Sequence, residues 1–283
     1  MTNKTIVFGK GYLGHRISNK MDCDLTGINL LEKKELADYL DHEKPDVVIN
    51  AAGKTGRPNI DWCETHKQET VEGNIIAASN LCMECSKRGI YFVHIGSGGV
   101  YNGDNNGKGF NEEDEPDFYG SQFYARTKII SEKILNEFPS LLLRIQMPLD
   151  EIPHKRNLID KLKDYSKLIN AQNSMTTIPH MLDAITYLTN KRSQGIYNIV
   201  NPGTISASEI MTYYKEIIDP SHNFEMISLA SLDNFTVGKR CNCYLNSDKL
   251  KKEGFELPEI HKAVVSCLKN YKNALINLKN NKY

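Results

Sequence analysis

The sequence predicts an α/β fold, in which a doubly wound parallel sheet carries a smaller C-terminal α+β lobe. Short apolar, β-branched runs alternate with helical patterns through the first half of the 283 residues, and this alternation is typical of βαβ units. A glycine-rich turn follows the first of these runs. After Pro148 the alternation gives way to helical patterns with fewer strands. We therefore expect two units, residues 1–148 and 149–283, with some segments of the second returning to the sheet.

The first half of the chain supplies the strands and helices of the expected sheet domain. Each expected strand is a short run rich in Val, Ile, Leu or Phe, and each expected helix has apolar residues three or four positions apart. We expect strands at 4–9, 23–28, 45–53, 90–97 and 141–147. We expect helices through Leu13, Ile17 and Met21, over 29–44 beginning at Asn29, over 69–89 closed by Gly89, and over 122–138.

The second half mixes helical patterns with one strand. A serine at the start of 206–218 and a glutamate three residues later predict a capped helix. We expect further helices at 156–170, 178–192 and from Pro258 onward, and a strand with a turn at 195–203.

Composition and charge exclude several classes of protein. The 35 acidic residues balance the 35 Lys plus Arg, which argues against a chain built to coat nucleic acid. No apolar run approaches the roughly 20 residues of a membrane span. Seven cysteines form no regular framework, so we expect a reduced, cytoplasmic protein. Cys82 and Cys85 lie in a strongly helical stretch where cysteine usually packs in the core, and Cys241 and Cys243 form a C-x-C; we expect no metal.

Residues 9–14 read GKGYLG, which is the G-x-G-x-x-G pattern. It follows a strand and opens a helix, which is the context that a Rossmann-type dinucleotide site requires. The glycines permit a tight turn and close approach of a pyrophosphate to the backbone, and the helix N-terminus favours its negative charge. The expected cofactor contacts are Gly9, Lys10, Gly11, Tyr12, Leu13, Gly14 and Arg16, with Ala51, Ala52 and Gly53 after the third strand.

The residues at the end of the second expected strand predict which dinucleotide the protein binds. An NAD site usually has an acidic residue about 20 residues beyond the glycines, where it holds the ribose hydroxyls. This chain reads TGIN at that place and has no carboxylate there. Lys10 and Arg16 are both positioned to reach a 2′-phosphate. We therefore expect NADP(H).

A serine, a tyrosine and a lysine follow the glycine loop in an order that suggests proton transfer. Ser97 ends the expected strand 90–97, and Tyr124 and Lys128 lie four residues apart on one face of the next helix. The Tyr-x-x-x-Lys spacing alone decides nothing. With a dinucleotide loop in place, however, the three residues resemble the proton-transfer site of the short-chain dehydrogenase/reductase superfamily. The resemblance implies that Tyr124 protonates a ketone oxygen, that Lys128 lowers the pKa of the tyrosine and holds the ribose, and that Ser97 aligns the carbonyl.

A longer resemblance narrows the family. Residues 50–74, above all TGRPN and DWCE, are similar to the epimerase/reductases that make nucleotide-linked rhamnose. The plant-type UDP-4-keto-6-deoxyglucose 3,5-epimerase/4-reductase is most similar, and the dTDP-4-dehydrorhamnose reductases are more distant. Supporting stretches are GFNEEDEPDFYGSQFYARTK, LRIQMP, RNLI, NSMT and NPGTIS. The resemblance implies NADPH-dependent reduction of the C4 ketone of a UDP-4-keto-6-deoxy sugar after epimerisation at C3 and C5, giving UDP-L-rhamnose.

Epimerisation needs a proton donor and a proton acceptor on opposite faces of the sugar. The resemblance implies a lysine, matched by Lys167, and a cysteine close after Ser97, where this chain has Gly99. Cys63 is our first candidate to replace that cysteine, and His66 is another possible proton carrier.

The remaining candidates bind the substrate or brace the site. Arg57 and Asn59 follow a sheet strand at the end where ligands bind. The resemblance adds Asn173, in NSMT, and Arg240 as a clamp for the diphosphate, since a guanidinium binds phosphate through two parallel hydrogen bonds. It implies that Asn74 braces the site rather than touching the substrate.

Two alternatives stay open. Relatives of these reductases include catalytically silent, dinucleotide-binding regulatory subunits, and a complete Ser97–Tyr124–Lys128 set argues against that role. A GDP-fucose-synthase-like epimerase/reductase is the second alternative, against which TGRPN and DWCE count. The expected partners are a UDP-sugar substrate and an upstream 4,6-dehydratase that supplies it. We expect no nucleic acid and no membrane partner, and a homodimer is an alternative to a monomer.

Overall fold

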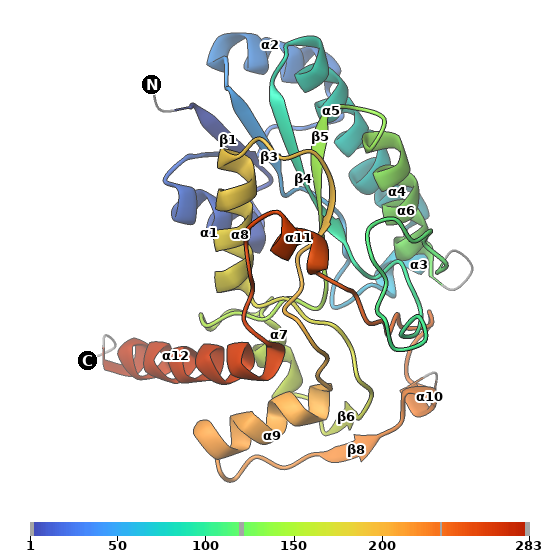
Figure 1. The fold of residues 1–283 in the computed structure, drawn as a ribbon, viewed down its shortest axis with the longest axis vertical. Helices are drawn as coiled ribbons and strands as arrows, with labels where there is room; N and C mark the ends of the chain where they lie inside the picture. The colour runs from blue at the N-terminus through green and yellow to red at the C-terminus, as the bar shows by residue number, and fades with distance from the viewer. Residues whose placement is uncertain (1–2, 119–121, 233, 281–283) are drawn as a thin grey trace.

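The computed structural model describes residues 3–118, 122–232 and 234–280, and a six-stranded parallel sheet forms its centre (Figure 1). The strand order is β2-β1-β3-β4-β5-β7. The strands are β1 (Thr5–Phe8), β2 (Asp24–Thr26), β3 (Val47–Asn50), β4 (Tyr91–Ser97), β5 (Ser140–Ile145) and β7 (Gly195–Asn198). The predicted α/β fold with a Rossmann-type sheet is confirmed. Residues 119–121, which belong to one stretch behind the family resemblance, lie outside the described residues.

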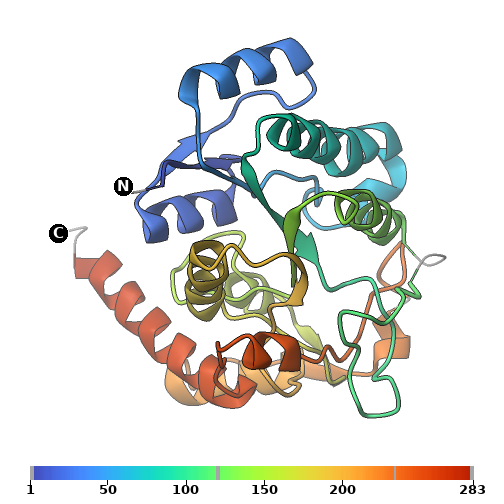
Figure 2. The same ribbon diagram turned by 45° about the horizontal axis from the view of Figure 1, so that its top comes forward.

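Helices cover both faces of this sheet, so the strands are buried on both sides (Figure 2). Alternate residues of β1 point to opposite faces: Val7 packs in one apolar cluster, and Ile6 and Phe8 in another. The first cluster includes residues of α1 (Tyr12–Met21) and α8 (Ile178–Asn190). The second includes residues of α2 (Lys33–Glu43), α5 (Ala77–Lys87) and α6 (Phe123–Leu135). Parallel strands end at one edge, so the turns after β1, β3 and β4 lie together there.

The C-terminal lobe has its own apolar core. Residues of α7 (Leu158–Leu162), α9 (Ala207–Ile217) and α12 (Ile260–Asn280) pack together there, beside the short parallel pair β6 (Lys167–Ile169) and β8 (Glu225–Ile227). The lobe lies at one end of the molecule in Figure 1. Two elements after residue 148 return to the sheet: β7 pairs with β5, and α8 covers one face. Among the described helices, none is both long and apolar enough to span a bilayer.

Several expected elements differ from the structure. Helix α2 begins at Lys33 rather than Asn29, because the Asn29 side chain accepts a hydrogen bond from the Leu31 N–H in a turn (3.1 Å). The expected helix 156–170 is wrong beyond α7, because residues 167–169 pair with β8, which is distant in sequence.

The stretch expected as one helix over 69–89 is divided. It consists of α4 (Lys67–Val71), the π-helix η1 (Glu72–Ile76) and α5, and a short helix α3 (Trp62–Thr65) precedes it. Two other short helices that the sequence did not predict are α10 (Leu229–Leu232) and α11 (Asp248–Lys252).

Cys82 and Cys85 are core residues, as expected. Both thiols lie in the apolar cluster between α5 and the sheet, and burial raises the pKa of Cys82 to about 12. A thiol in such surroundings stays protonated and unreactive.

A buried ion pair joins the sheet to α6. Arg144 of β5 is 1% exposed, and its guanidinium donates to both oxygens of Glu132 on α6 (2.8 and 2.7 Å). Its third donor bonds the Tyr101 hydroxyl (2.8 Å), which donates in turn to the Asp114 carbonyl (2.6 Å). Three segments around the end of β4 are therefore held by one cation.

Replacing only one member of this pair should destabilise the fold. In Arg144→Met the Glu132 carboxylate stays buried without its partner, so we expect the free energy of unfolding in urea to fall by about 3–5 kcal/mol. The double variant Arg144→Met/Glu132→Leu should recover much of the loss, because neither charge of the pair is then left buried without its partner. As a control, Lys34→Met removes an exposed pair with Asp38 and should leave the free energy of unfolding almost unchanged. An equally small change in Arg144→Met would contradict this account.

Candidate active site

The glycine loop after β1 forms a cradle. At Gly9 and Gly14 it is packed too tightly to accept a side chain. Gly9 has φ +108°, and a Cβ there would lie 2.6 Å from Ala52 N; a Cβ on Gly14 would lie 1.9 Å from the Gly9 carbonyl oxygen. Around Gly11, by contrast, no atom comes within 4 Å of a Cβ position. Gly11 also begins α1, whose first turn has neither a side-chain cap nor an acidic residue. The open space and the uncapped N–H groups fit a pyrophosphate.

The side chain of Lys10 lies over the end of β2. A Cβ placed on Gly27, the residue after β2, would be 3.1 Å from Lys10 Cδ and 3.5 Å from its Cε. This is the place where a ribose-binding carboxylate would stand in an NAD site. Lys10 is exposed, so its ammonium is available to a ligand there.

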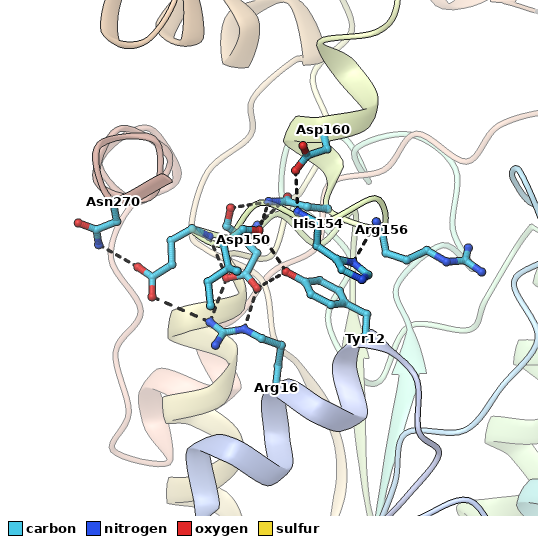
Figure 3. A network of polar contacts seen from close by, with 10 residues as sticks. Tyr12, Arg16, Asp150, His154, Arg156, Asp160 and Asn270 are labelled. Carbon is cyan, nitrogen blue, oxygen red and sulfur yellow. Dashed lines mark hydrogen bonds and ion pairs between the residues drawn. The ribbon is translucent and has the colours of Figure 1, made fainter. Parts of the chain in front are cut away.

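Arg16 and Tyr12 have a partner that the sequence analysis did not foresee (Figure 3). Arg16 forms a two-pronged ion pair with Asp150, Nε to Oδ2 at 2.7 Å and Nη2 to Oδ1 at 3.0 Å. The Tyr12 hydroxyl donates to the same carboxylate, whose side chain is fully buried, and the Tyr12 ring stacks on His154. The Arg16 guanidinium is thus paired with a carboxylate of the lobe, so its expected role at a 2′-phosphate stays a prediction and Lys10 is the more accessible candidate.

Ser97 and Tyr124 meet at the carboxyl end of β4. Their hydroxyl groups are hydrogen-bonded, and both side chains are partly exposed. Lys128 follows one helical turn after Tyr124 and is 7% exposed. This end of β4 and the glycine loop lie at the same edge of the parallel sheet. The three residues therefore stand beside the cradle described above.

Burial dominates the electrostatics of this group. It raises the pKa of Tyr124 to about 12, while the hydrogen bond from Ser97 acts in the opposite direction. Burial also lowers the pKa of Lys128 to about 8, against the attraction of Glu132. The groups that shift the pKa of Tyr124 in this geometry are its buried surroundings, Ser97 and Cys63, and the expected lowering of that pKa by Lys128 stays a prediction. Tyr124 is a protonated acid at neutral pH, which suits donation to a ketone oxygen.

Asn74 braces the site, as expected. It lies on the π-helix η1, and its Oδ1 accepts from Lys54 N (2.8 Å) while its Nδ2 donates to the Lys54 carbonyl (3.0 Å) and to Thr127 Oγ1 (3.1 Å). The loop after β3 is thereby joined to the helix that carries Tyr124 and Lys128. A π-turn at a functional site is a recurrent feature of helices.

Cys63 and His66 both contact other residues of their own segment. The Cys63 side chain is 0% exposed, and burial raises its pKa, although a hydrogen bond with the Thr70 hydroxyl opposes this. Cys63 lies near enough to raise the pKa of Tyr124. The His66 ring stacks on Trp62 at 4.0 Å between centroids. Cys63 has no exposed surface through which to reach a sugar in this geometry, whereas His66 is partly exposed.

Three expected substrate contacts have protein partners in the structure. Arg240 forms a two-pronged ion pair with Asp61 (2.7 and 2.7 Å). The Asn59 side chain accepts from Asp61 N (2.8 Å), although Asn59 itself is exposed. Asn173 is 7% exposed, and its Oδ1 accepts from Gln146 Nε2 (3.3 Å) and Cys243 N (3.2 Å). The contacts of these three residues with other protein groups fix the segments at the rim of the site.

Arg57 and Lys167 are the more accessible candidates. Arg57 is exposed in the loop after β3. The Lys167 side chain is 47% exposed, and its Nζ lies 3.5 Å from Glu225 and above the Phe235 ring. Lys167 belongs to β6 of the lobe.

Four further residues close the same region and were missed by sequence analysis. Glu64 accepts from Phe123 N at the start of α6 (2.7 Å), and Arg156 donates to the Gly56 carbonyl (3.2 Å). Asp61 and Gln146 are described above. Asp61 and Glu64 stand in the DWCE segment, which the sequence analysis singled out without assigning a partner to either carboxylate.

Comparison with known proteins agrees with this geometry. Residues 5–140 match the NAD dependent epimerase/dehydratase family. The chain is 34% identical over 275 residues to a bifunctional dTDP-4-dehydrorhamnose 3,5-epimerase/dTDP-4-dehydrorhamnose reductase of Arabidopsis thaliana, which covers 92% of this chain and 90% of the relative. The chain belongs to the NAD-dependent epimerase/dehydratase family. The resemblances to short-chain dehydrogenase/reductases and to the nucleotide-sugar epimerase/reductases of the rhamnose pathway, inferred from the motifs, are confirmed.

Two other members of the epimerase/dehydratase family are similar over nearly the whole chain. A trifunctional UDP-glucose 4,6-dehydratase/UDP-4-keto-6-deoxy-D-glucose 3,5-epimerase/UDP-4-keto-L-rhamnose-reductase of Arabidopsis thaliana is 34% identical over 93% of the chain, which spans only 41% of that relative. The UDP-rhamnose synthase of Acanthamoeba polyphaga mimivirus superposes with a TM-score of 0.90 at 27% identity, covering 95% of this chain and 100% of that structure.

The buried charge of Lys128 should weaken the fold. Its folded-state pKa of about 8 lies below its ordinary value, so the protonated form opposes folding at pH 7, and this cost shrinks as the pH rises from 8 toward 10. We expect Lys128→Met to raise the free energy of unfolding at pH 7 by up to about 3 kcal/mol. The gap to wild type should shrink to about 1 kcal/mol at pH 10, because the lysine of the unfolded chain, with an ordinary pKa of about 10.4, then also begins to lose its proton.

Urea titrations at pH 7 and pH 10 measure this difference. Lys133→Met, which removes a lysine exposed on the same helix and paired with Glu115, is the matched control and should shift stability by less than about 0.5 kcal/mol. A Lys128→Met variant that is less stable than wild type at both pH values would refute the account.

Proposed function

We propose that the chain reduces the C4 ketone of a UDP-4-keto-6-deoxy sugar with NADPH, after epimerising C3 and C5, to give UDP-L-rhamnose. The observation that carries this proposal is the hydrogen-bonded Ser97–Tyr124 pair at the end of β4, one helical turn before a buried lysine. The similarity to epimerase/reductases over more than nine tenths of the chain supports the choice of substrate class.

The reduction assigns one task to each residue of the site. The dinucleotide supplies a hydride to the carbonyl carbon. Tyr124 gives its proton to the carbonyl oxygen, and Ser97 donates a hydrogen bond that keeps the oxygen aligned. Because the pKa of Tyr124 is raised to about 12, the proton is present at neutral pH. Lys128 lies behind them, where its ammonium holds the ribose.

Epimerisation requires groups that the reduction does not use. The ketone at C4 acidifies C3 and C5, so a base on one face and an acid on the other can invert each centre through an enolate. Lys167 is the proposed group on the lobe side, and its half-exposed position is compatible with that role. Cys63, the first candidate for the other face, is fully buried.

The substrate has to come from another reaction. A 4-keto-6-deoxy sugar is the product of a 4,6-dehydratase, so we propose that such an enzyme supplies this one. Arg57 is our candidate for a contact with the sugar nucleotide, because it is exposed beside the loop that Asn74 positions.

One assay tests the proposed function directly. The purified protein with NADPH and UDP-4-keto-6-deoxyglucose should oxidise the cofactor and yield UDP-L-rhamnose, identified by NMR. Tyr124→Phe should keep its affinity for NADPH, because the glycine cradle is intact, and lose about a hundred- to ten-thousandfold in turnover, because the proton donor is gone. Near wild-type turnover in Tyr124→Phe would remove Tyr124 from the mechanism, and a different product sugar would refute the substrate assignment.

The cofactor preference tests the position of Lys10. We expect a higher kcat/KM with NADPH than with NADH, because a lysine and no carboxylate lies at the end of β2. Lys10→Ala should reduce that ratio by about tenfold, which corresponds to one exposed charge–phosphate contact of roughly 1.4 kcal/mol. Lys44→Ala, at an exposed lysine after α2, is the control. A wild-type preference for NADH would overturn the NADPH assignment.

A further inference from the structure

The C-x-C motif of Cys241 and Cys243 lies beside Ser97. The backbone of this segment is fixed from two sides: Gly103 N donates to Asn242 O (2.9 Å), and Ser174 N donates to Cys243 O (2.9 Å). Asn173 also accepts a hydrogen bond from Cys243 N. Residues from the loop after β4 and from the lobe therefore hold the motif in place.

This arrangement brings Cys241 against Gly99. A Cβ placed on Gly99 would lie 3.4 Å from Ser97 Oγ, 3.5 Å from Gln146 Oε1 and 3.8 Å from Cys241 Cβ. The absence of a side chain at Gly99 leaves the Cys241 side chain as a direct neighbour of the space next to Ser97. Cys241 is partly exposed, unlike the fully buried Cys63.

We propose that Cys241 is the group that exchanges a proton with the sugar on one face during epimerisation. This inference rests on the epimerase half of the proposed function. The inference uses a residue that the reduction does not need. Cys241 takes the role that was otherwise assigned to Cys63.

The proton transfer balances without any oxidant or reductant. As a thiolate, Cys241 takes the proton from the carbon next to the ketone, forming an S–H bond, and the electron pair of the C–H bond moves into the enolate. A second group on the opposite face, for which Lys167 is the candidate, returns a proton to the same carbon. Proton exchange of both groups with water restores the starting state.

The polar groups around the Cys241 sulfur include one hydrogen-bond acceptor and one donor. The Cys241 Sγ lies 3.0 Å from the Tyr101 carbonyl oxygen, which accepts from the thiol form, and 3.7 Å from Gln146 Nε2, which can donate to the thiolate. Cys243 Sγ is 3.6 Å away. The neighbouring Cys241 and burial raise the pKa of Cys243 well above its ordinary value, so Cys243 keeps its proton, which it donates to the Gly98 carbonyl oxygen (3.5 Å).

Deuterium exchange isolates this step from reduction. With UDP-4-keto-6-deoxyglucose in D₂O and no NADPH, wild type should incorporate deuterium at C3 and C5, followed by NMR. We expect Cys241→Ser to slow incorporation at one or both carbons by about a hundredfold or more. Its rate of NADPH-dependent reduction of the already epimerised keto sugar should stay within about threefold of wild type.

A rescue variant separates chemistry from packing. Gly99 is not in the left-handed region, and a Cβ there meets ordinary contact distances, so Gly99→Cys in the Cys241→Ser background moves the thiol to the neighbouring residue. We expect this double variant to recover at least tenfold of the lost exchange. Cys23→Ser, which removes a thiol beside β2 and away from the site, should exchange like wild type.

The outcomes distinguish this inference from the proposed function. Wild-type exchange at both carbons in Cys241→Ser would overturn the inference, as would loss of exchange in Cys63→Ala with normal exchange in Cys241→Ser. A wild-type protein that reduces the epimerised sugar and shows no exchange would refute the epimerase half and the role of Cys241 together. A wild-type protein that exchanges deuterium and fails to reduce would refute the reductase while the Cys241 variants still decide this inference.

Discussion

The candidate active site depends on one buried cation. Arg144 stands on β5 of the sheet; its Nε and Nη2 donate to Glu132 on α6, and its Nη1 donates to the Tyr101 hydroxyl beyond the end of β4. Glu132 lies one turn after Lys128, and Tyr101 lies four residues after Ser97. The same guanidinium therefore fixes the helix that carries the tyrosine and lysine against the strand that carries the serine. Side chains that must transfer a proton over hydrogen-bond distances need this kind of support, because small displacements cost large factors in rate.

The site is also closed by segments that are distant in sequence. The loop after β3 is bonded to the lobe through Arg156 and Gly56, and α3 is bonded to residues 238–240 through Asp61 and Arg240. Glu64 connects α3 to the first turn of α6. Charged groups that sequence analysis assigned to ligands thus serve partly to position one another. Their pairing also offsets part of the charge at the rim, so that cations with no acidic partner among the described residues, such as Lys10, dominate the attraction of an anionic cofactor.

Sequence analysis predicted correctly those features that a local residue pattern determines by itself. The glycine loop was predictable because the turn excludes Cβ atoms at Gly9 and Gly14, and the sheet was predictable because apolar runs alternate with helices. It failed where a distant partner decides the outcome. Lys167 to Ile169 form a strand only because β8 lies beside them. Arg16 looked available because nothing in its neighbourhood of the sequence announces Asp150, which lies 134 residues away. The proximity of Cys241 to Gly99 likewise depends on backbone pairing between segments far apart in the chain.

The contact of Arg16 and Tyr12 with Asp150 has a mechanical consequence. The helix that begins at the dinucleotide cradle is attached to the lobe through a carboxylate with no exposed surface, and Asn270 of α12 bonds the adjacent Glu151. Moving the lobe away from the helix that begins at the cradle would separate the Asp150 carboxylate from the Arg16 guanidinium, which costs several kcal/mol. The two halves therefore resist hinge opening about this junction, and the compliance that a bulky ligand requires on entry is left to exposed loop residues such as Arg57 and Asn59.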